Sequence, residues 1–360
     1  MFLRTQPKKC SSPDPTSNKN STGFKKKRKG KGELGVPDNN WTGSTRGLTI
    51  LNKLPPDTPS SAFPKTNPFH SMNDLVHRVI SGYHVAVRLL RHEVLDARPE
   101  QWRLAVDTLA RLYFPPKDLV VRSWNWHGMP TESVSRKGGK EGAPPIVWIH
   151  GGGFAFCSPR THRAAAGALA AITGREVWLP DYPLAPEQPF PAAHRALDHV
   201  PIEGPLDIVG DSAGGNLALS WALRRQNGDR LALLSPWVDL RVNGASSSNN
   251  VADHSAFDRD DLREYASLYL GGEAPTNPAC SPVLADRASF AALGEVYIEC
   301  AANELLNADA QLLASRMREA GVSLTTHEEA RAHHGWQLLP DILPEAKQSA
   351  ERLGQFLASP

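Results

Sequence analysis

The fold of this chain is decided by one stretch, Leu206-Asp207-Ile208-Val209-Gly210-Asp211-Ser212-Ala213-Gly214. A mostly apolar run over residues 206–209 leads into the pattern G-x-S-x-G, and a helix-like segment follows over residues 215–223. A serine on a sharp strand-to-helix turn holds its hydroxyl above the sheet, and the two glycines let the backbone pack closely enough to form that turn. We therefore predict that Ser212 is a nucleophile. Because the bare pattern also occurs by chance, a structural turn is the alternative.

A glycine-rich segment, His150-Gly151-Gly152-Gly153-Phe154, lies upstream of this turn and directly follows the apolar run 146–149. Main-chain N–H groups of residues without Cβ can turn toward one point and stabilise the negative oxygen of a tetrahedral intermediate. This pattern predicts an oxyanion hole built from the N–H groups of Gly151, Gly152, Gly153 and Ala213. A flexible glycine turn is the alternative, and His150 itself is expected to brace the loop.

Short apolar runs alternate with helical stretches from residue 119 onward. The expected strands are 119–126, 146–149, 176–179, 206–209, 231–234, 296–300 and 324–327. The expected helices are 161–172, 190–199, 214–225, 259–270, 307–320 and 344–357. This alternation predicts an α/β fold with a mostly parallel sheet that helices cover on both faces. Together with the serine turn it indicates an α/β-hydrolase.

The base for Ser212 is sought among the late histidines, because an α/β-hydrolase carries its triad in the order serine, acid, histidine. Only His327, His333 and His334 follow the expected acid position. His327 lies within an expected strand and is interpreted as a strand residue. His334 is favoured over His333, because Gly335 follows it and allows a tight turn toward the nucleophile.

The acid is expected just after the strand 296–300, at the edge of the sheet where the other loops lie. Glu304 is the carboxylate that precedes the next helix, and Asp309 already lies inside that helix. A glutamate can hold the tautomer of the imidazole and stabilise the imidazolium as an aspartate does. The alternative is an exposed surface glutamate, which is common in loops.

The N-terminal part differs in composition from the rest. Residues 1–67 are rich in Pro, Ser, Asn, Lys and Gly, which is typical of a segment that cannot bury enough apolar surface to fold, so we predict a disordered extension. Its first 31 residues hold ten Lys or Arg and one acid, whereas the whole chain carries a net charge of +2, so the body is mildly acidic. The basic run 25–29 is interpreted as solvated, with a nuclear-import signal or an anion-binding tail as the alternative. Two helical patterns follow, from Met72 to Leu90 and from Trp102 to Tyr113.

The bulk properties exclude several classes of protein. The mildly acidic body predicts no nucleic-acid partner. The four cysteines lack the spacing of a metal site, so neither a metal nor a disulfide framework is expected, which favours a reducing compartment. No apolar stretch suits a signal peptide or a membrane span. The predicted location is cytoplasmic.

The motifs together resemble the hormone-sensitive lipase family of esterases, also called bacterial family IV. The resemblance covers about residues 72–357 and rests on the segments 150–154, 181–187 (DYPLAPE), 210–216 (GDSAGGN), 235–240 (SPWVDL) and 334–336 (HGW). It implies an eight-stranded α/β-hydrolase core with an N-terminal helical cap, active on short acyl esters without a cofactor. The expected parts are an extension over 1–67, a cap over 68–118 and a catalytic domain over 119–360. In the family the segment 181–187 braces the glycine-rich loop, so Asp181 and Tyr182 are interpreted as structural.

The acid position departs from the usual pattern of the family, which has Asp there. One alignment puts Asn303 in that place, and the triad would then be incomplete. The family spacing favours Glu304 instead, since the acid precedes the histidine by about thirty residues and Glu304 precedes His334 by 30. Some members with the Gly-Asp-Ser-Ala-Gly form are similar in using Glu.

The predicted function is hydrolysis of short- to medium-chain carboxylic esters through Ser212, His334 and Glu304, with an acyl-enzyme intermediate. Phe154, Phe156 and Trp237, with residues of the cap, are the candidates for lining the substrate pocket. The alternatives are a ligand-binding pseudo-hydrolase and an amide or N-acetyl hydrolase with the same machinery. The expected partner is a small-molecule ester, and the oligomeric state, including a homodimer, stays open.

Overall fold

The computed structural model describes residues 99–112, 118–139, 142–200, 202–242 and 257–358. By its internal contacts the chain divides between Pro64 and Lys65, and all described residues belong to the second unit. The predicted extension 1–67 and the predicted helix from Met72 to Leu90 lie outside the described residues. Of the predicted cap, the structure describes helix α2 (Pro99–Leu112).

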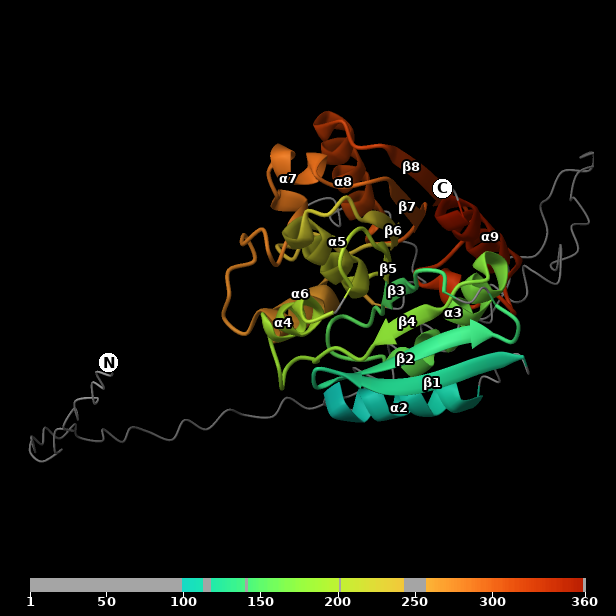
Figure 1. Ribbon diagram of the computed structural model, residues 1–360. Helices are drawn as coiled ribbons and strands as arrows, with labels where there is room; N and C mark the ends of the chain where they lie inside the picture. The colour runs from blue at the N-terminus through green and yellow to red at the C-terminus, as the bar shows by residue number, and fades with distance from the viewer. Residues whose placement is uncertain (1–98, 113–117, 140–141, 201, 243–256, 359–360) are drawn as a thin grey trace, which may run out of the picture. The chain divides into compact units, whose positions relative to one another are not determined.

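The core of this unit is one eight-stranded sheet (Figure 1). The strands lie in the order β1-β2-β4-β3-β5-β6-β7-β8; β1 pairs antiparallel with β2 and β2 with β4, and the remaining pairs are parallel. Their bounds are β1 (Leu119–Trp126), β2 (Met129–Arg136), β3 (Ile146–Ile149), β4 (Val177–Pro180), β5 (Asp207–Asp211), β6 (Arg230–Leu234), β7 (Val296–Ala301) and β8 (Leu324–Glu329). The predicted fold class is confirmed, and each strand expected from its apolar run lies within two residues of its predicted position.

Strand β2 was not predicted from the apolar pattern. Its sequence MPTESVSR mixes polar and apolar residues, and its burial does not alternate strictly. The strand forms because it pairs along its whole length with β1 across a two-residue turn. His127 (φ 45°) and Gly128 (φ 95°) both adopt positive φ, as a type I′ hairpin turn requires. The turn was therefore a better indicator of β2 than its side chains.

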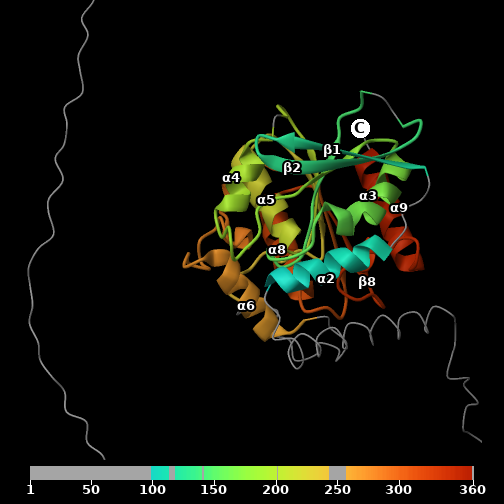
Figure 2. The ribbon, with the colours of Figure 1, turned by 90° about the horizontal axis from the view of Figure 1, so that it is seen from below.

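Helices cover both faces of the sheet (Figure 2). Helices α3 and α9 pack on one face, and α4, α5 and α8 on the other. The helices are α3 (Pro159–Thr173), α4 (Ala192–Asp198), α5 (Ala213–Arg225), α6 (Arg259–Leu270), α7 (Arg287–Ala291), α8 (Asn307–Ala320) and α9 (Pro344–Ala358), with 3₁₀ turns η3 (Pro282–Leu284) and η4 (Trp336–Leu338). The short helix α7 was not predicted.

The central strands are buried on both sides, which is why they read as continuous apolar runs rather than as alternating ones. In β3, Val147 and Ile149 belong to the cluster on the α5 face, whereas Ile146 and Trp148 belong to the cluster under α3 and α9. All four are buried. The two clusters fix the register of β3, because a shift by one residue would exchange the faces.

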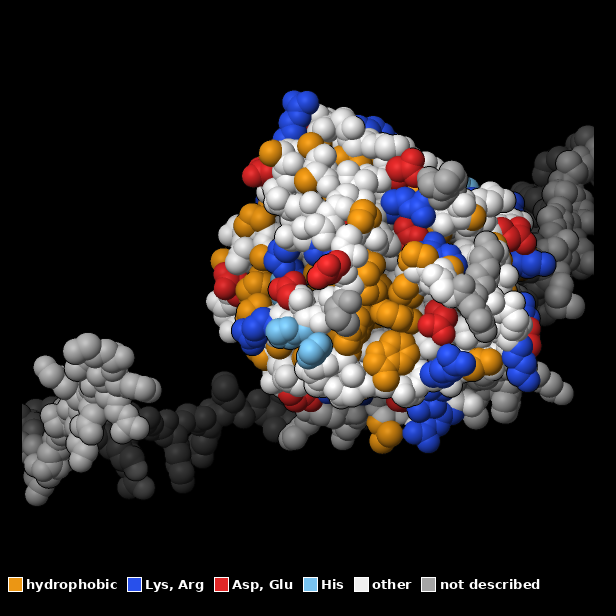
Figure 3. Space-filling model, in the orientation of Figure 1, with side chains coloured by type: hydrophobic (Ala, Val, Ile, Leu, Met, Phe, Trp, Pro, Cys, Tyr) orange, Lys and Arg blue, Asp and Glu red, His pale blue; other side chains and the backbone are white. Residues whose placement is uncertain are grey.

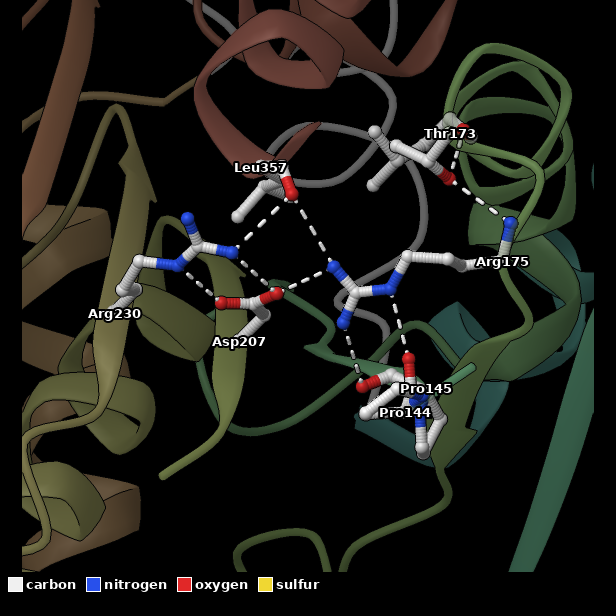
Figure 4. Close-up of polar contacts among 8 residues, drawn as sticks. Pro144, Pro145, Thr173, Arg175, Asp207, Arg230 and Leu357 are labelled. Carbon is white, nitrogen blue, oxygen red and sulfur yellow. Dashed lines mark hydrogen bonds and ion pairs between the residues drawn. The ribbon is translucent and has the colours of Figure 1, made fainter. Parts of the chain in front are cut away.

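The amino-terminal edge of the sheet is held by charges (Figure 4). Asp207, the first residue of β5, accepts Arg175 Nη1 at 2.5 Å and Arg230 Nε at 2.7 Å. Both guanidinium groups also donate to the carbonyl of Leu357 in α9, at 3.3 and 3.2 Å. The contacts join β5, β6 and α9 at the edge opposite to the carboxyl ends of the parallel strands.

Tryptophan side chains connect the antiparallel end of the sheet to β4. Trp178 of β4 meets Trp124 and Trp126 of β1 edge-on, with ring centroids 5.3 Å apart in each pair. Figure 3 shows hydrophobic side chains gathered over β2 and β4 in the middle of the view. The tryptophan contacts reach across β2, which lies between β1 and β4 in the sheet, and edge-on aromatic contacts of this kind stabilise packing.

Candidate active site

Ser212 lies on the turn between β5 and α5, at the carboxyl edge of the sheet. Its backbone is in an unusual conformation, with φ 52° and ψ −122°, which costs a non-glycine residue on the order of 1–3 kcal/mol. The surrounding chain holds it there, because the Ser212 N–H donates to the Leu234 carbonyl at 2.9 Å and its own carbonyl accepts the N–H of Trp237 at 3.0 Å. A Cβ on Gly214 would lie 2.1 Å from the Ile149 carbonyl oxygen, so only glycine fits the turn.

The side chain of Asp211, directly before the serine, connects this turn to the glycine-rich loop. Its buried carboxylate accepts Trp148 Nε1 at 2.9 Å, His162 Nε2 at 3.1 Å and the N–H of Gly151 at 3.1 Å. Burial alone would raise the pKa of Asp211, but the charge and hydrogen bond of His162 and the bond from Trp148 outweigh it and lower the pKa below its ordinary value. An ionised carboxylate is acceptor-only and can satisfy all three donors at once.

The carbonyls of the glycine-rich loop nearly all have donors, which fixes the orientation of its peptide groups. Side chains donate to three of these carbonyls: Tyr182 Oη to His150 at 2.9 Å, His150 Nδ1 to Gly151 at 2.8 Å and Arg103 Nε to Ala155 at 2.5 Å. Backbone N–H groups donate to two others: those of Ala155 and Phe156 to Gly152, at 3.0 and 2.9 Å, and that of Ala185 to Phe154 at 2.9 Å. Because buried backbone groups are almost always paired, the N–H groups that remain unpaired identify where a ligand would bind.

Three of the four predicted oxyanion donors are available. The N–H groups of Gly152, Gly153 and Ala213 make no hydrogen bond within the described part of the chain. The N–H of Gly151 is the exception, because it already donates to Asp211. The prediction is corrected for Gly151: its role here is to attach the loop to the serine turn. The side-chain direction of Asp211, which decides this, could not be read from the sequence.

His150 is enclosed in the core and braces the loop, as predicted. Its ring stacks on Tyr182 with centroids 4.3 Å apart, and its Nδ1 lies 2.8 Å from the Gly151 carbonyl. Burial, with the neighbouring charge of His162, lowers the pKa of His150 to about 3. His150 is therefore neutral at physiological pH, so that Nδ1–H can donate to Gly151.

Glu304 and His334 form a short contact at the same edge of the sheet. Glu304 follows β7 and His334 follows β8, and Glu304 Oε2 lies 2.7 Å from His334 Nδ1. The other oxygen of Glu304 accepts the N–H of Ala301 at 3.0 Å, which fixes the carboxylate on its own loop. The side chain of His334 is 12% exposed, and Phe257 packs edge-on against its ring at 4.8 Å.

The neighbouring candidates lie elsewhere. Asn303 is exposed, and its amide donates to the Ala330 carbonyl at 3.4 Å rather than to a histidine. His327 lies on β8, where its Nε2 is 3.7 Å from Glu329. Of the two residues that compete for the acid position, Glu304 is the one that contacts His334.

The three predicted pocket aromatics differ in exposure. Phe154 and Trp237 are each 1% exposed: Phe154 stacks on Tyr269 at 3.8 Å, and Trp237 donates to the Asp239 carbonyl at 3.3 Å. Both lie behind the surface in this structure. Phe156 is half-buried, 5.4 Å from Tyr265.

Helix α6 supplies two side chains that the sequence reasoning did not single out. Tyr265 lies against Gly153, where an added Cβ would come within 3.0 Å of its ring. Tyr269 stacks on Phe154 at 3.8 Å. Their spacing of four residues on the predicted helix 259–270 indicated one shared face, but it did not indicate that this face meets the glycine-rich loop.

Neither a metal-binding cluster nor a membrane-spanning helix occurs among the described residues. No cluster of three or more His, Cys, Asp or Glu side chains there is arranged to hold a metal ion. No helix in the described ranges is long and apolar enough to cross a membrane.

The sequence matches a family model described as alpha/beta hydrolase fold over residues 146–338. An acetyl-hydrolase of Streptomyces hygroscopicus is 31% identical over 281 residues, covering 74% of this chain and 91% of that protein. A crystal structure of an esterase from the bacterial hormone-sensitive lipase family superposes with a TM-score of 0.68 at 28% identity, covering 78% of this chain and 97% of that one. The chain belongs to the hormone-sensitive lipase family of α/β-hydrolases. An esterase of Acinetobacter venetianus is 29% identical over 279 residues, covering 74% of this chain and 90% of that protein.

The segment 181–187 is one of the motifs that this chain shares with the hormone-sensitive lipase family, and it contacts the glycine-rich loop directly. The resemblance predicted that this segment braces the glycine-rich loop, and it does so through two direct bonds, from the Tyr182 hydroxyl to His150 and from the Ala185 N–H to Phe154. Asp181 extends the bracing toward β2, since its N–H donates to the Pro130 carbonyl at 2.8 Å.

Proposed function

We propose that this carboxylesterase-type hydrolase cleaves short- to medium-chain acyl esters with Ser212 as nucleophile, His334 as base and Glu304 as the acid that orients the base. The observation that carries the proposal is the 2.7 Å contact between Glu304 and His334, on loops that end at the same sheet edge as the Ser212 turn. Three N–H groups beside that turn, which have no acceptor among the residues that the structure describes, support it further.

The first half of the reaction forms the acyl-enzyme. Glu304 accepts Nδ1–H of His334, which leaves the lone pair on Nε2 to remove the proton of the Ser212 hydroxyl. The Ser212 oxygen then bonds to the ester carbonyl carbon, and the carbonyl π electrons move onto the oxygen. The carboxylate of Glu304 stabilises the imidazolium that forms.

The oxyanion is held by Gly152, Gly153 and Ala213, whose N–H groups are preorganised by the bonds to the surrounding carbonyls. The intermediate collapses as His334 gives its proton to the leaving alkoxide, and the alcohol departs. Water, deprotonated by His334, then attacks the acyl-enzyme and releases the acid, which returns Ser212 to its starting state.

The pocket is assigned mainly to aromatic side chains. Phe156 is half-buried and contacts Tyr265, so these two are the candidates for direct contact with substrate. Phe154 and Trp237 are buried, so they do not contact substrate and instead support the loop and the turn that carry the oxyanion donors. The proposed partner is a small-molecule ester. The cytoplasmic location and the lack of a nucleic-acid partner stay predictions, and the oligomeric state, including a homodimer, stays open.

The test is hydrolysis of p-nitrophenyl acetate and butyrate by Ser212→Ala. We expect kcat to fall by about 10⁴–10⁶, the range seen when a serine nucleophile is removed. Ser220→Ala is the matched control, because Ser220 is a buried serine on α5 that bonds to the Ala279 carbonyl and not to the site. Wild-type turnover in Ser212→Ala would overturn the assignment. A series from acetate to palmitate tests the substrate class, and a preference for palmitate would contradict it.

Removal of acetyl groups, including those bound as amides, is a second candidate, and one relative is named acetyl-hydrolase. The chemistry would be the same, with an amine as leaving group. Comparing p-nitrophenyl acetate with p-nitroacetanilide decides between the two, because an amidase would cleave the anilide at a measurable rate that is lost in Ser212→Ala, whereas an esterase would cleave only the ester. The alternative of a pseudo-hydrolase is weakened by the Glu304–His334 contact, since a protein that only binds ligand does not need it.

A further inference from the structure

Arg103 on helix α2 joins three segments of the chain. Its Nε donates to the Ala155 carbonyl at 2.5 Å, and Nη2 donates to the Ala185 carbonyl. Both terminal nitrogens bind the carboxylate of Glu187, each at 2.7 Å. The side chain is 24% exposed, so the guanidinium is largely enclosed by these partners.

The carbonyl that Arg103 holds belongs to the same tight turn as two of the oxyanion donors. Ala155 lies two residues after Gly153, and its N–H donates back to the Gly152 carbonyl at 3.0 Å. The preceding carbonyl, that of Phe154, accepts the N–H of Ala185, whose own carbonyl accepts Arg103. The carbonyls of Phe154 and Ala155 therefore both depend on Arg103, that of Ala155 directly and that of Phe154 through Ala185.

Asp211 and Arg103 act at opposite ends of this loop. Asp211 fixes its beginning through the N–H of Gly151, and Arg103 fixes its end through the carbonyl of Ala155. Gly152 and Gly153 lie between these two points. Both glycines adopt positive φ, of 105° and 56°. Because residues without Cβ have wide conformational freedom, the segment keeps this conformation only if its ends are held.

A second contact on the same face of α2 attaches the helix to the same region. Asp107, one helical turn after Arg103, accepts the Ser158 hydroxyl at 2.6 Å, and Ser158 is the residue before α3. Glu187 supplies the counter-charge for Arg103, and the hydrogen bond from Arg103 lowers the pKa of Glu187. A planar guanidinium fork suits this combination of two carbonyls and one carboxylate, whereas a lysine could not bind all of them at once.

We propose that Arg103 is a positioning residue of the oxyanion hole, so that docking of α2 is a requirement for catalysis and not only for enclosing the pocket. The inference rests on the proposed function. Arg103 does not touch the substrate; it acts through the Ala155 carbonyl on the direction of the Gly152 and Gly153 N–H groups. An ordinary ion pair with Glu187 would instead affect folding stability alone.

The experiment compares Arg103→Ala and Arg103→Lys in the full chain, with Arg111→Ala as the matched control. Arg111 is an exposed arginine on the same helix. For both Arg103 variants we expect kcat on p-nitrophenyl acetate to fall by about 10- to 100-fold, less than the loss of a whole oxyanion donor, with KM changed less than about threefold. The inhibition constant of a methyl trifluoromethyl ketone, whose adduct with Ser212 needs the same donors, should rise by a similar factor.

The outcomes separate the two hypotheses. Folded Arg103→Ala with kcat and inhibitor affinity within about twofold of wild type would overturn the inference, even if its unfolding temperature falls. If Arg103→Ala does not fold, Arg103→Lys decides by the same criteria, with Glu187→Gln as a further variant that leaves Arg103 and Ala155 in place. Normal turnover in Ser212→Ala would overturn the proposed function itself, whereas an inactive Ser212→Ala beside a normal Arg103 variant overturns only the role of Arg103.

Discussion

Two histidine–carboxylate pairs flank the serine turn, and they are alike in chemistry but different in their remaining contacts. Glu304 meets His334 at 2.7 Å, and Asp211 meets His162 at 3.1 Å, with both carboxylates buried. His162 is fully enclosed, and its second nitrogen lies 2.7 Å from the Thr161 hydroxyl. His334 is partly exposed, and its second nitrogen has no partner among the described residues.

The difference shows what separates a structural pair from one suited to proton transfer. A histidine can act as a base only if one nitrogen is free to reach the reacting group while the other is oriented. In His162 both nitrogens are engaged, so the ring serves as a rigid donor to Asp211. In His334 only Nδ1 is engaged, and this is the nitrogen that a catalytic acid should hold.

The largest expected effect tests this difference directly. His334→Ala should lower kcat on p-nitrophenyl butyrate by about 10⁴ or more, because the base is lost. His162→Gln is the matched change in the other pair. It should keep kcat within about tenfold, because the amide can still donate to Asp211, and lower the free energy of unfolding by about 1–3 kcal/mol, because the buried ring and its bond with Thr161 are lost. Steady-state kinetics and urea unfolding measure both, and equal losses of activity would show that the pairs do not differ as described.

The next effect concerns the acid. Glu304→Gln should lower kcat by about 10²–10⁴, because the amide leaves His334 without a counter-charge and favours the wrong tautomer. Asn303→Asp is the control, since Asn303 is directed to the Ala330 carbonyl. We expect its activity to stay close to wild type, and a large gain in its rate would assign the acid role to position 303.

A smaller effect is expected for Asp211→Asn, which weakens the pair with His162. The side-chain NH2 of the asparagine would oppose one of the three N–H donors that now bind the carboxylate of Asp211. The Gly151 end of the loop should therefore loosen, and kcat should fall by about 10- to 100-fold because the oxyanion donors are less well oriented. Because the folded pKa of Asp211 lies below its ordinary value of 3.8, the ionised form stabilises the fold above that pH, and this contribution is lost as pH falls through the folded pKa.

Urea unfolding at several pH values checks the sign. The stability difference between wild type and Asp211→Asn should be constant from about pH 5 to pH 8 and shrink below about pH 4. A difference that grows as the pH falls would contradict the assigned charge of Asp211.

Much of the fold and part of the site could be predicted because they follow from local patterns. The apolar runs located the parallel strands, and the spacing between positions 304 and 334 favoured the carboxylate that contacts His334. Strand β2 was missed because its side chains do not alternate and its pairing with β1 decides its conformation. The bond from Gly151 to Asp211 and the bond from Arg103 to Ala155 were missed, because a sequence does not show which way a side chain points toward a residue 60 or 52 positions away.

The pairing of the glycine-rich loop also has a consequence for amide hydrogen exchange. Gly151 donates to a buried carboxylate and should exchange slowly. Gly152 and Gly153 are consecutive amides without an acceptor in the described part of the chain, and they should exchange fast in the free protein. A ligand that places an oxygen in the hole would slow the exchange of these two amides and leave Gly151 unchanged. Hydrogen exchange at Gly152 and Gly153 therefore reports whether the oxyanion hole is occupied, and the measurement needs no turnover of substrate.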